Sequence, residues 1–308
     1  MAHSTTVLVL SPGTGGHFFG ELLSGLTREV AAVGGRVVLV QTLSPGVSTD
    51  ESLESPDFST PAAWAEVDGA VAITNAVRGT YLQRLRDTGK PVVVACTRID
   101  GFDAALALPD NHHGTVAAVE HLIAHGHTRI GFVTNRDRTD ADERLAAYRG
   151  TLEAHGLVID PALVFTAPEN SERGGAQAAQ AVLAAPRPPS ALMVATDRTA
   201  IGLMRVLTDA GLAIPRDIAV MAFDNIEAGA FSTPTLSSVN QRFDEVGALA
   251  GRLVLAQIRG EAVPFTPHSV PAAGIALRGS CGCATDAPGG RPRGPAMQVP
   301  TWPRPTAR

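Results

Sequence analysis

Short apolar runs alternate with longer amphipathic stretches along most of this chain. Apolar runs of four to eight residues have the length of buried strands, and apolar residues that recur every three or four positions indicate helices. The runs that predict strands are residues 7–10, 36–41, 69–74, 91–96, 129–134, 163–166, 191–195 and 218–223. Helices are predicted between most of them, the longest at 18–33, 142–155 and 246–259. Repeated strand-helix alternation predicts an α/β fold with parallel sheets.

The alternation pauses near residue 108 and then resumes, which divides the pattern into two Rossmann-like lobes. A chain of 308 residues is long enough to build two cores. We expect an N-terminal lobe from residues 6–108 and 241–264, and a C-terminal lobe from residues 109–240 and 265–283, with three crossings near 108–111, 237–241 and 264–269. Residues 284–308 hold six prolines and four arginines with almost no apolar periodicity, which predicts a disordered tail.

The run at 218–223 predicts a central strand, and Asp224-Asn225 follows its carboxyl end. Open parallel sheets place ligand-contacting groups at these ends. Asp is also a common helix N-cap, so a ligand contact and a cap are both open at this position. Other polar residues follow neighbouring predicted strands: Arg138, Asp140 and Arg144 come after 129–134, and Asp197 comes after 191–195. Polar groups at three strand ends favour a binding site, although an isolated arginine is more often a solvated surface charge.

A glycine-rich loop, residues 11–17, lies between the first predicted strand and the first helix. Backbone N–H groups at such a junction can hold an anion. The loop has neither a full dinucleotide fingerprint nor a Walker lysine, so it indicates no particular cofactor. Its Gly-Thr-Gly-Gly-His segment is similar to the loop of MurG-type UDP-sugar glycosyltransferases, which supplies an enzyme alternative. Phe18 and Phe19 follow it and favour either core packing or stacking on a ligand.

Other chemistry is not evident in the sequence. Cys281-Gly-Cys283 offers two thiols, which do not make a four-ligand zinc site without another nearby Cys or His cluster, so no metal is expected. The Asn-His-His-Gly segment at 111–114 is predicted to be a turn, and His121, His125 and His127 lie at one predicted helix end, so structural roles are expected for these histidines. No Gly-x-Ser-x-Gly nucleophile elbow is present, so we expect a protein that is not an enzyme and has no cofactor.

Composition limits which partners and which cellular compartment are expected for this chain. A net charge of -5 and a pI near 6.0 give no basic footprint for nucleic acid. Three cysteines are too few for a disulfide framework, and the start lacks the basic region of a signal peptide. No apolar run approaches the roughly 18 residues of a membrane span. A cytoplasmic protein without membrane contact is therefore expected.

Several segments together resemble the effector-binding domain of the LacI/GalR family of bacterial regulators, which has a periplasmic-binding-protein-like type I fold of two lobes. The segments are Asp-Asn-His-His-Gly at 110–114, Glu-His-Leu-Ile-Ala-His-Gly-His-Thr-Arg-Ile-Gly at 120–131, Ala-Thr-Asp-Arg-Thr-Ala-Ile-Gly at 195–202 and Thr-Leu-Ser-Ser-Val-Asn-Gln at 235–241. They occur in the family's order, and the resemblance runs from about residue 6 to Cys283.

The resemblance implies a cytoplasmic, allosteric sensor of a sugar or nucleoside-like effector that closes between two lobes. It implies that Arg144 reaches the ligand and that Asp224 lies opposite it. It also implies packing contacts from Phe18 and Phe19, and secondary polar or hinge contacts from Arg138, Asp197 and Gln241. A homodimer is expected. Because no residues before Val7 match the family's helix-turn-helix, sequence-specific DNA binding by this chain alone is not expected. A stand-alone solute-binding protein is a further alternative.

Overall fold

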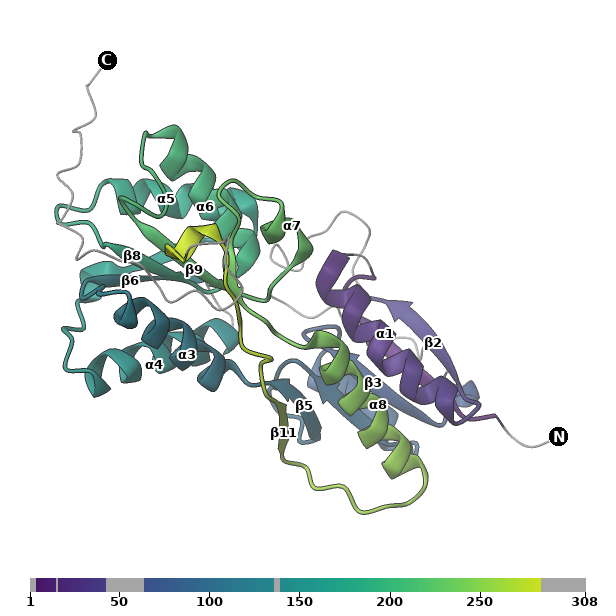
Figure 1. The fold of residues 1–308 in the computed structure, drawn as a ribbon. Coiled ribbons are helices and arrows are strands. Elements are labelled where there is room, and N and C mark those ends of the chain that lie inside the picture. Colours follow the sequence, from purple (N-terminus) through teal and green to yellow (C-terminus); the bar gives the residue numbers. More distant parts are fainter. Residues whose placement is uncertain (1–3, 15, 43–63, 136–138, 284–308) are drawn as a thin grey trace. The chain divides into compact units, whose positions relative to one another are not determined.

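The computed structural model describes residues 4–14, 16–42, 64–135 and 139–283. The chain divides into two compact units, each with its own sheet (Figure 1). One consists of Met1–Asp110 and Arg242–Ala272, and the other of Asn111–Gln241 and Ala273–Arg308. The predicted α/β fold with two parallel-dominated sheets is confirmed. The third crossing falls after Ala272, which is later than the predicted 264–269.

The first unit is built on a six-stranded parallel sheet in the order β11-β5-β4-β3-β1-β2. Alternate residues of its strand β1 enter separate cores, because successive side chains of a strand point to opposite faces. Val7 and Val9 pack with α1 and α8, whereas Leu8 and Leu10 pack with α2. The elements are β1 (Thr6–Ser11), α1 (Gly16–Ala32), β2 (Arg36–Gln41), η1 (Trp64–Glu66), β3 (Gly69–Ile73), α2 (Gly79–Arg86), β4 (Val92–Ala95), β5 (Ala105–Pro109), α8 (Phe243–Ile258) and β11 (Pro267–Val270).

Strand β11 corrects one predicted boundary. Residues 265–272 were assigned to the second lobe from sequence, yet they lie in the first unit. The reason is the parallel pairing of β11 with β5, in which Pro267 is opposite Leu106 and Val270 is opposite Pro109. This pairing places β11 at the edge of the first sheet.

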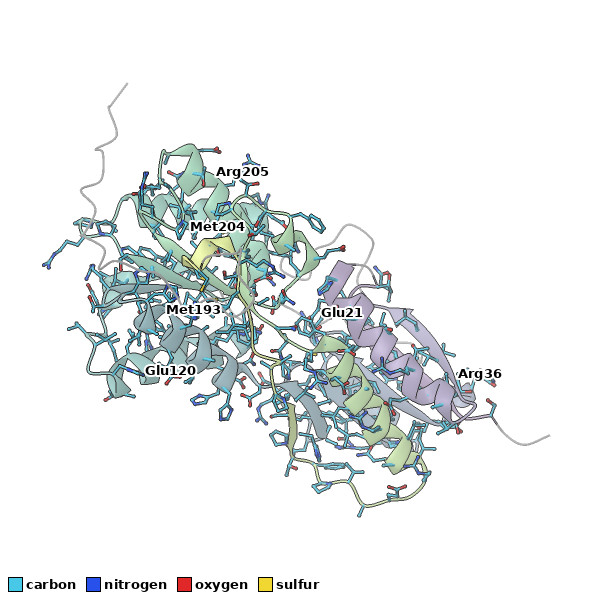
Figure 2. All side chains as sticks on the ribbon, in the orientation of Figure 1. Glu21, Arg36, Glu120, Met193, Met204 and Arg205 are labelled. Carbon is cyan, nitrogen blue, oxygen red and sulfur yellow. The ribbon has the colours of Figure 1, made fainter. Side chains whose placement is uncertain are left out.

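The second unit has a sheet in the order β12-β10-β9-β8-β6-β7, parallel except for the antiparallel edge strand β12. Helices α3 and α4 cover one face and α5 and α6 the other (Figure 1). On α6, Met204 is 2% exposed in the core, and the adjacent Arg205 points outward (Figure 2). The elements are α3 (Asn111–Ala124), β6 (Ile130–Asn135), α4 (Thr139–Ala154), η2 (Pro161–Leu163), β7 (Val164–Ala167), α5 (Glu172–Leu183), β8 (Ala191–Val194), α6 (Asp197–Asp209), β9 (Ala219–Phe223), α7 (Glu227–Ala230), β10 (Ser237–Val239), β12 (Ile275–Ala276) and η3 (Gly279–Cys281).

Glycines allow one helix pair in each unit to pack with its backbones in close approach. In the first unit, a Cβ on Gly25 of α1 would overlap the carbonyl of Asp244, and one on Gly247 of α8 would overlap the carbonyl of Leu22. Backbone atoms cannot move aside as a flexible side chain can. The crossing of α1 and α8 therefore requires glycine at both positions.

Helices α5 and α6 of the second unit cross in the same way. A Cβ on Gly175 would overlap the carbonyl of Thr199, and a Cβ on Gly202 would overlap the carbonyl of Glu172. The two units share this device although their sequences show no repeat of fixed period.

Some predictions from sequence need correction or fall outside the described residues. The Asn-His-His-Gly segment, predicted as a turn, forms the first turn of α3, which begins at Asn111. Arg138 and the tail at 284–308 lie outside the described residues. Among the described residues, no helix combines the length and the apolar character needed to cross a lipid bilayer.

Candidate functional site

The predicted polar residues of the second unit gather at one edge of its sheet. Strands β6, β8 and β9 are adjacent and parallel, so their carboxyl ends lie side by side. Asn135 ends β6, Thr196-Asp197 follow β8, and Asp224 follows β9. This edge is where open α/β sheets bind ligands.

Arg144 of α4 lies at this edge and is 2% exposed. Its Nε–H donates to Asn111 Oδ1 at 2.9 Å, and its Nη1 donates to the carbonyl oxygen of Ala195 at 2.6 Å. The guanidinium also lies over an aromatic ring, with Cζ 3.8 Å from the centroid of Phe223. These three contacts hold the guanidinium plane in one orientation.

Two carboxylates flank the guanidinium at distances longer than hydrogen bonds. Arg144 Nη1 lies 3.5 Å from Asp224 Oδ1, and Nη2 lies 3.7 Å from Asp140 Oδ2. Hydrogen bonds between ionised groups are about 2.7–2.9 Å long. Both carboxylate side chains are 16% exposed, whereas the arginine beneath them is buried. The arrangement places two carboxylates beside a fixed cation. It suits a ligand hydroxyl that accepts a hydrogen bond from the guanidinium and donates one to a carboxylate.

The backbone after β9 adopts a conformation that residues with a side chain rarely take. Asp224 has φ 113° and Asn225 has φ 56°. Such positions cost free energy and persist where the surrounding structure fixes them, often at ligand-binding sites. Here the N–H of Asp224 donates to the carbonyl of Val239 at 3.1 Å, and Arg278 donates to Asn225 Oδ1 at 2.7 Å. The turn therefore sets the direction of the Asp224 carboxylate.

Asp197 holds this turn in place through hydrogen bonds. Its side chain is fully buried, and its Oδ2 accepts the N–H of Ile226 at 2.8 Å while its Oδ1 accepts the hydroxyl of Ser238 at 2.6 Å. Burial, together with the nearby charge of Asp224, raises the pKa of Asp197 well above its ordinary value. Because both oxygens already accept hydrogen bonds, Asp197 acts on the site through the turn.

Gln241, just after β10, was also predicted to contribute. It is 2% exposed, and neither its amide oxygen nor its amide nitrogen has a hydrogen-bond partner among the described residues. A buried amide without a hydrogen-bond partner costs about 1–3 kcal/mol. Sequence reasoning assigned no site role to Asn111, Ser238 and Arg278, which act by holding other site residues.

The predicted aromatic pair lies in the first unit. Phe18 and Phe19 are half-buried at the start of α1 and pack against the core of that unit. Phe18 makes edge contacts with Phe19 and with Phe243, each with ring centroids 4.8 Å apart. The ring of Phe19 covers Gly13 in the glycine-rich loop, of which Gly15 lies outside the described residues. Both rings therefore have a core role and retain partial exposure.

Comparison with known proteins identifies the class of protein. The model of the periplasmic binding protein-like domain matches residues 119–281. The ribose operon repressor of Escherichia coli (strain K12) is 31% identical over 249 residues, which cover 80% of this chain and 73% of that protein. A LacI family transcriptional regulator from Mycobacterium smegmatis, 24% identical, has the same fold with a TM-score of 0.74 and covers 90% of this chain and 98% of the other.

A third similar structure is that of the transcriptional regulator CelR in complex with cellobiose. It is 25% identical with a TM-score of 0.73, and the match covers 90% of this chain and 84% of that one. The fold and the site define a ligand-binding, periplasmic binding protein-like domain of a transcriptional regulator. The chain belongs to the LacI family of regulators and comprises their effector-binding domain. It is a regulator and not a glycosyltransferase, since its relatives are transcriptional repressors.

Proposed function

We propose that the carboxyl edge of the second sheet binds a sugar or nucleoside-like effector, with Arg144 and Asp224 as the principal polar contacts. The observation that carries the proposal is the guanidinium of Arg144, fixed by Asn111, Ala195 and Phe223, with two carboxylates just beyond hydrogen-bond distance. A vicinal pair of hydroxyls fits this array, because each hydroxyl donates one hydrogen bond and accepts others.

The class of effector is supported by two relatives. One is the repressor of the ribose operon, and another was solved in complex with cellobiose. Sugars and nucleosides both present vicinal hydroxyls. The partnerless amide of Gln241 adds a donor and an acceptor to the same proposed site. Phe18 and Phe19 are proposed to supply an apolar contact from the first unit.

We further propose that effector binding is the regulatory signal. A ligand favours whichever conformation of the chain binds it more tightly, by as much as its affinity differs between conformations. The regulator is proposed to act in the cytoplasm as a homodimer, as the family resemblance implies.

The test is a thermal-shift panel that contains ribose, cellobiose, other sugars and nucleosides, followed by calorimetric titration of any hit. A ligand at 100 times its Kd stabilises the folded protein by about 2.7 kcal/mol. Asp224→Asn keeps the volume and tolerates the positive φ, so it is expected to fold and to lose most of the affinity. Arg144→Lys is expected to do the same, because an ammonium group cannot reproduce the planar fork of guanidinium donors.

Two matched controls lie on the outer side of α6. Arg205 and Asp209 form an ion pair in which both side chains are more than two-thirds exposed, so Arg205→Lys and Asp209→Asn should bind the effector as the unmodified chain does. A panel in which no sugar or nucleoside stabilises the protein would overturn the effector class. Full affinity in both Asp224→Asn and Arg144→Lys would overturn the site.

A further inference from the structure

Two histidines and a cysteine that are distant in the sequence meet at the end of α3. The Sγ atom of Cys283 lies 3.5 Å from His121 Nε2 and 3.5 Å from His125 Nε2. All three of these atoms lie within 4.8 Å of one another, and all three side chains are partly buried. The cluster lies wholly within the second unit.

These distances match the edges of a zinc tetrahedron. Zinc binds histidine nitrogen at about 2.0–2.1 Å and cysteine sulfur at about 2.3 Å. At a tetrahedral angle these bond lengths place nitrogen and sulfur about 3.6 Å apart. Both sulfur-nitrogen separations in the cluster are within about 0.1 Å of that value, so the thiol already lies at the distance from each histidine nitrogen that a shared zinc ion requires.

The backbone accounts for the convergence. His121 and His125 are four residues apart, and the N–H of His125 donates to the carbonyl of His121 at 3.2 Å, so both rings leave the same face of the helix. Gly282 has φ 89°, a left-handed conformation that lets the chain turn after η3 and bring Cys283 to these rings. The His121 and His125 ring centroids are 4.5 Å apart.

Two neighbouring side chains, His127 and Cys281, are not among the proposed ligands. His127 is engaged elsewhere, with its Nδ1 at 3.0 Å from the Ser190 hydroxyl. Cys281 is buried, and its thiol lies 3.6 Å from the carbonyl oxygen of Arg278 and also hydrogen-bonds with the Cys283 thiol, but it is not among the three converging ligand atoms.

We propose that His121, His125 and Cys283 form a zinc-binding site with a fourth position open to water. Two imidazoles and a thiolate are a donor set that zinc prefers over magnesium or calcium, which favour oxygen ligands. On binding, the Cys283 thiol releases its proton to solvent and the thiolate sulfur bonds to the metal, with no change of oxidation state. The site joins the last described residue of the chain to α3, and it does not depend on the proposed effector.

The test uses Co²⁺ as a spectroscopic substitute for zinc. The full chain is reduced, stripped with a chelator and titrated with Co²⁺, and Zn²⁺ is then added in competition. We expect one equivalent of Co²⁺ to give the visible bands of a tetrahedral site and a near-ultraviolet thiolate-to-cobalt band, both abolished by Zn²⁺. Cys283→Ser should lose the thiolate band, and His121→Ala and His125→Ala should each weaken binding by about tenfold or more.

The controls separate this site from other thiols and imidazoles. Cys96→Ser changes the cysteine of the first unit, Cys281→Ser changes the neighbouring thiol, and His112→Ala changes an exposed histidine at the other end of α3. All three should keep the thiolate band and bind Co²⁺ like the unmodified chain, and circular dichroism establishes that each variant is folded. A thiolate band that persists in Cys283→Ser, its loss in Cys281→Ser, or the absence of stoichiometric binding would overturn the proposal.

Discussion

The buried carboxylate of Asp197 accepts a hydrogen bond of 2.6 Å from the hydroxyl of Ser238. The same hydroxyl oxygen accepts the N–H of Asn225 at 3.0 Å, and the other carboxylate oxygen accepts the N–H of Ile226 at 2.8 Å. Two side chains from α6 and β10 therefore satisfy the backbone of the turn that follows β9. This turn carries Asp224. Asp197 and Ser238 therefore fix the position of Asp224 through the backbone of the turn.

Removal of the Ser238 hydroxyl is expected to weaken both folding and effector binding. Ser238→Ala leaves the Asn225 N–H and one oxygen of Asp197 without a partner, at a cost of about 1–3 kcal/mol in the free energy of unfolding. Urea unfolding measures that cost. Ser24→Ala, on the exposed side of α1, removes a hydroxyl without a buried role and should change the free energy of unfolding by less than about 0.5 kcal/mol. Equal effects of the two substitutions would contradict this role for Ser238.

The raised pKa of Asp197 gives the stability a pH dependence with a defined sign. The unfolded carboxyl has a pKa of about 3.9, so between that value and the higher folded value the folded state binds more protons than the unfolded state. Stability from this group therefore falls as the pH rises from about 4 through the folded pKa. In urea unfolding at several pH values, Asp197→Asn should gain stability relative to the unmodified chain as the pH rises. Parallel pH profiles for the two proteins would show that Asp197 does not titrate in this way.

The glycines at the α5 and α6 crossing give a contrast between two Gly→Ala substitutions. A Cβ on Gly202 overlaps a backbone carbonyl, so Gly202→Ala must push the helices apart and should destabilise by about 3 kcal/mol or more. Gly150, exposed on α4, has nothing within 4 Å of an added Cβ, and Gly150→Ala should stabilise by about 0.5–1 kcal/mol. Thermal unfolding of the two variants distinguishes these outcomes, and a stable Gly202→Ala protein would rule out a close backbone crossing.

The alternation of apolar runs and helical spacing predicted most of the fold because central parallel strands are buried on both faces and read as continuous apolar sequence. Strand β10 does not fit that rule. Two of its three residues are serines, and their hydroxyls bond to Asp197 and to the N–H of Arg278. Strand β5, at 105–109, ends on a proline beside a predicted crossing and was also not predicted. The serines of β10 therefore hide it from the hydrophobic pattern, whereas β5 is a short buried apolar run.

The candidate site was predictable where one residue follows one strand. Asp224 and Asp197 could be placed in this way, and the adjacency of β8 and β9 brings them together. The network around Arg144 could not be predicted from sequence, because Asn111 and Ala195 are 33 and 51 residues away from Arg144. The cluster of His121, His125 and Cys283 is more remote still, since 158 residues separate His125 from Cys283. Only the folded chain makes such groups neighbours.

Zinc is expected to stabilise the protein through the cluster of His121, His125 and Cys283. An ion that binds only the folded state at 100 times its Kd adds about 2.7 kcal/mol to the free energy of unfolding. The melting temperature should therefore be higher in excess Zn²⁺ than in excess chelator, both for the unmodified chain and for Cys96→Ser. The difference should vanish in Cys283→Ser, whose melting temperature should equal that of the chelated protein in both conditions. Since α3 begins at Asn111, which holds Arg144, and ends at the cluster, effector affinity measured with and without zinc would also show whether the two sites are coupled. A zinc-dependent shift that survives in Cys283→Ser would show that the ion acts elsewhere on the chain.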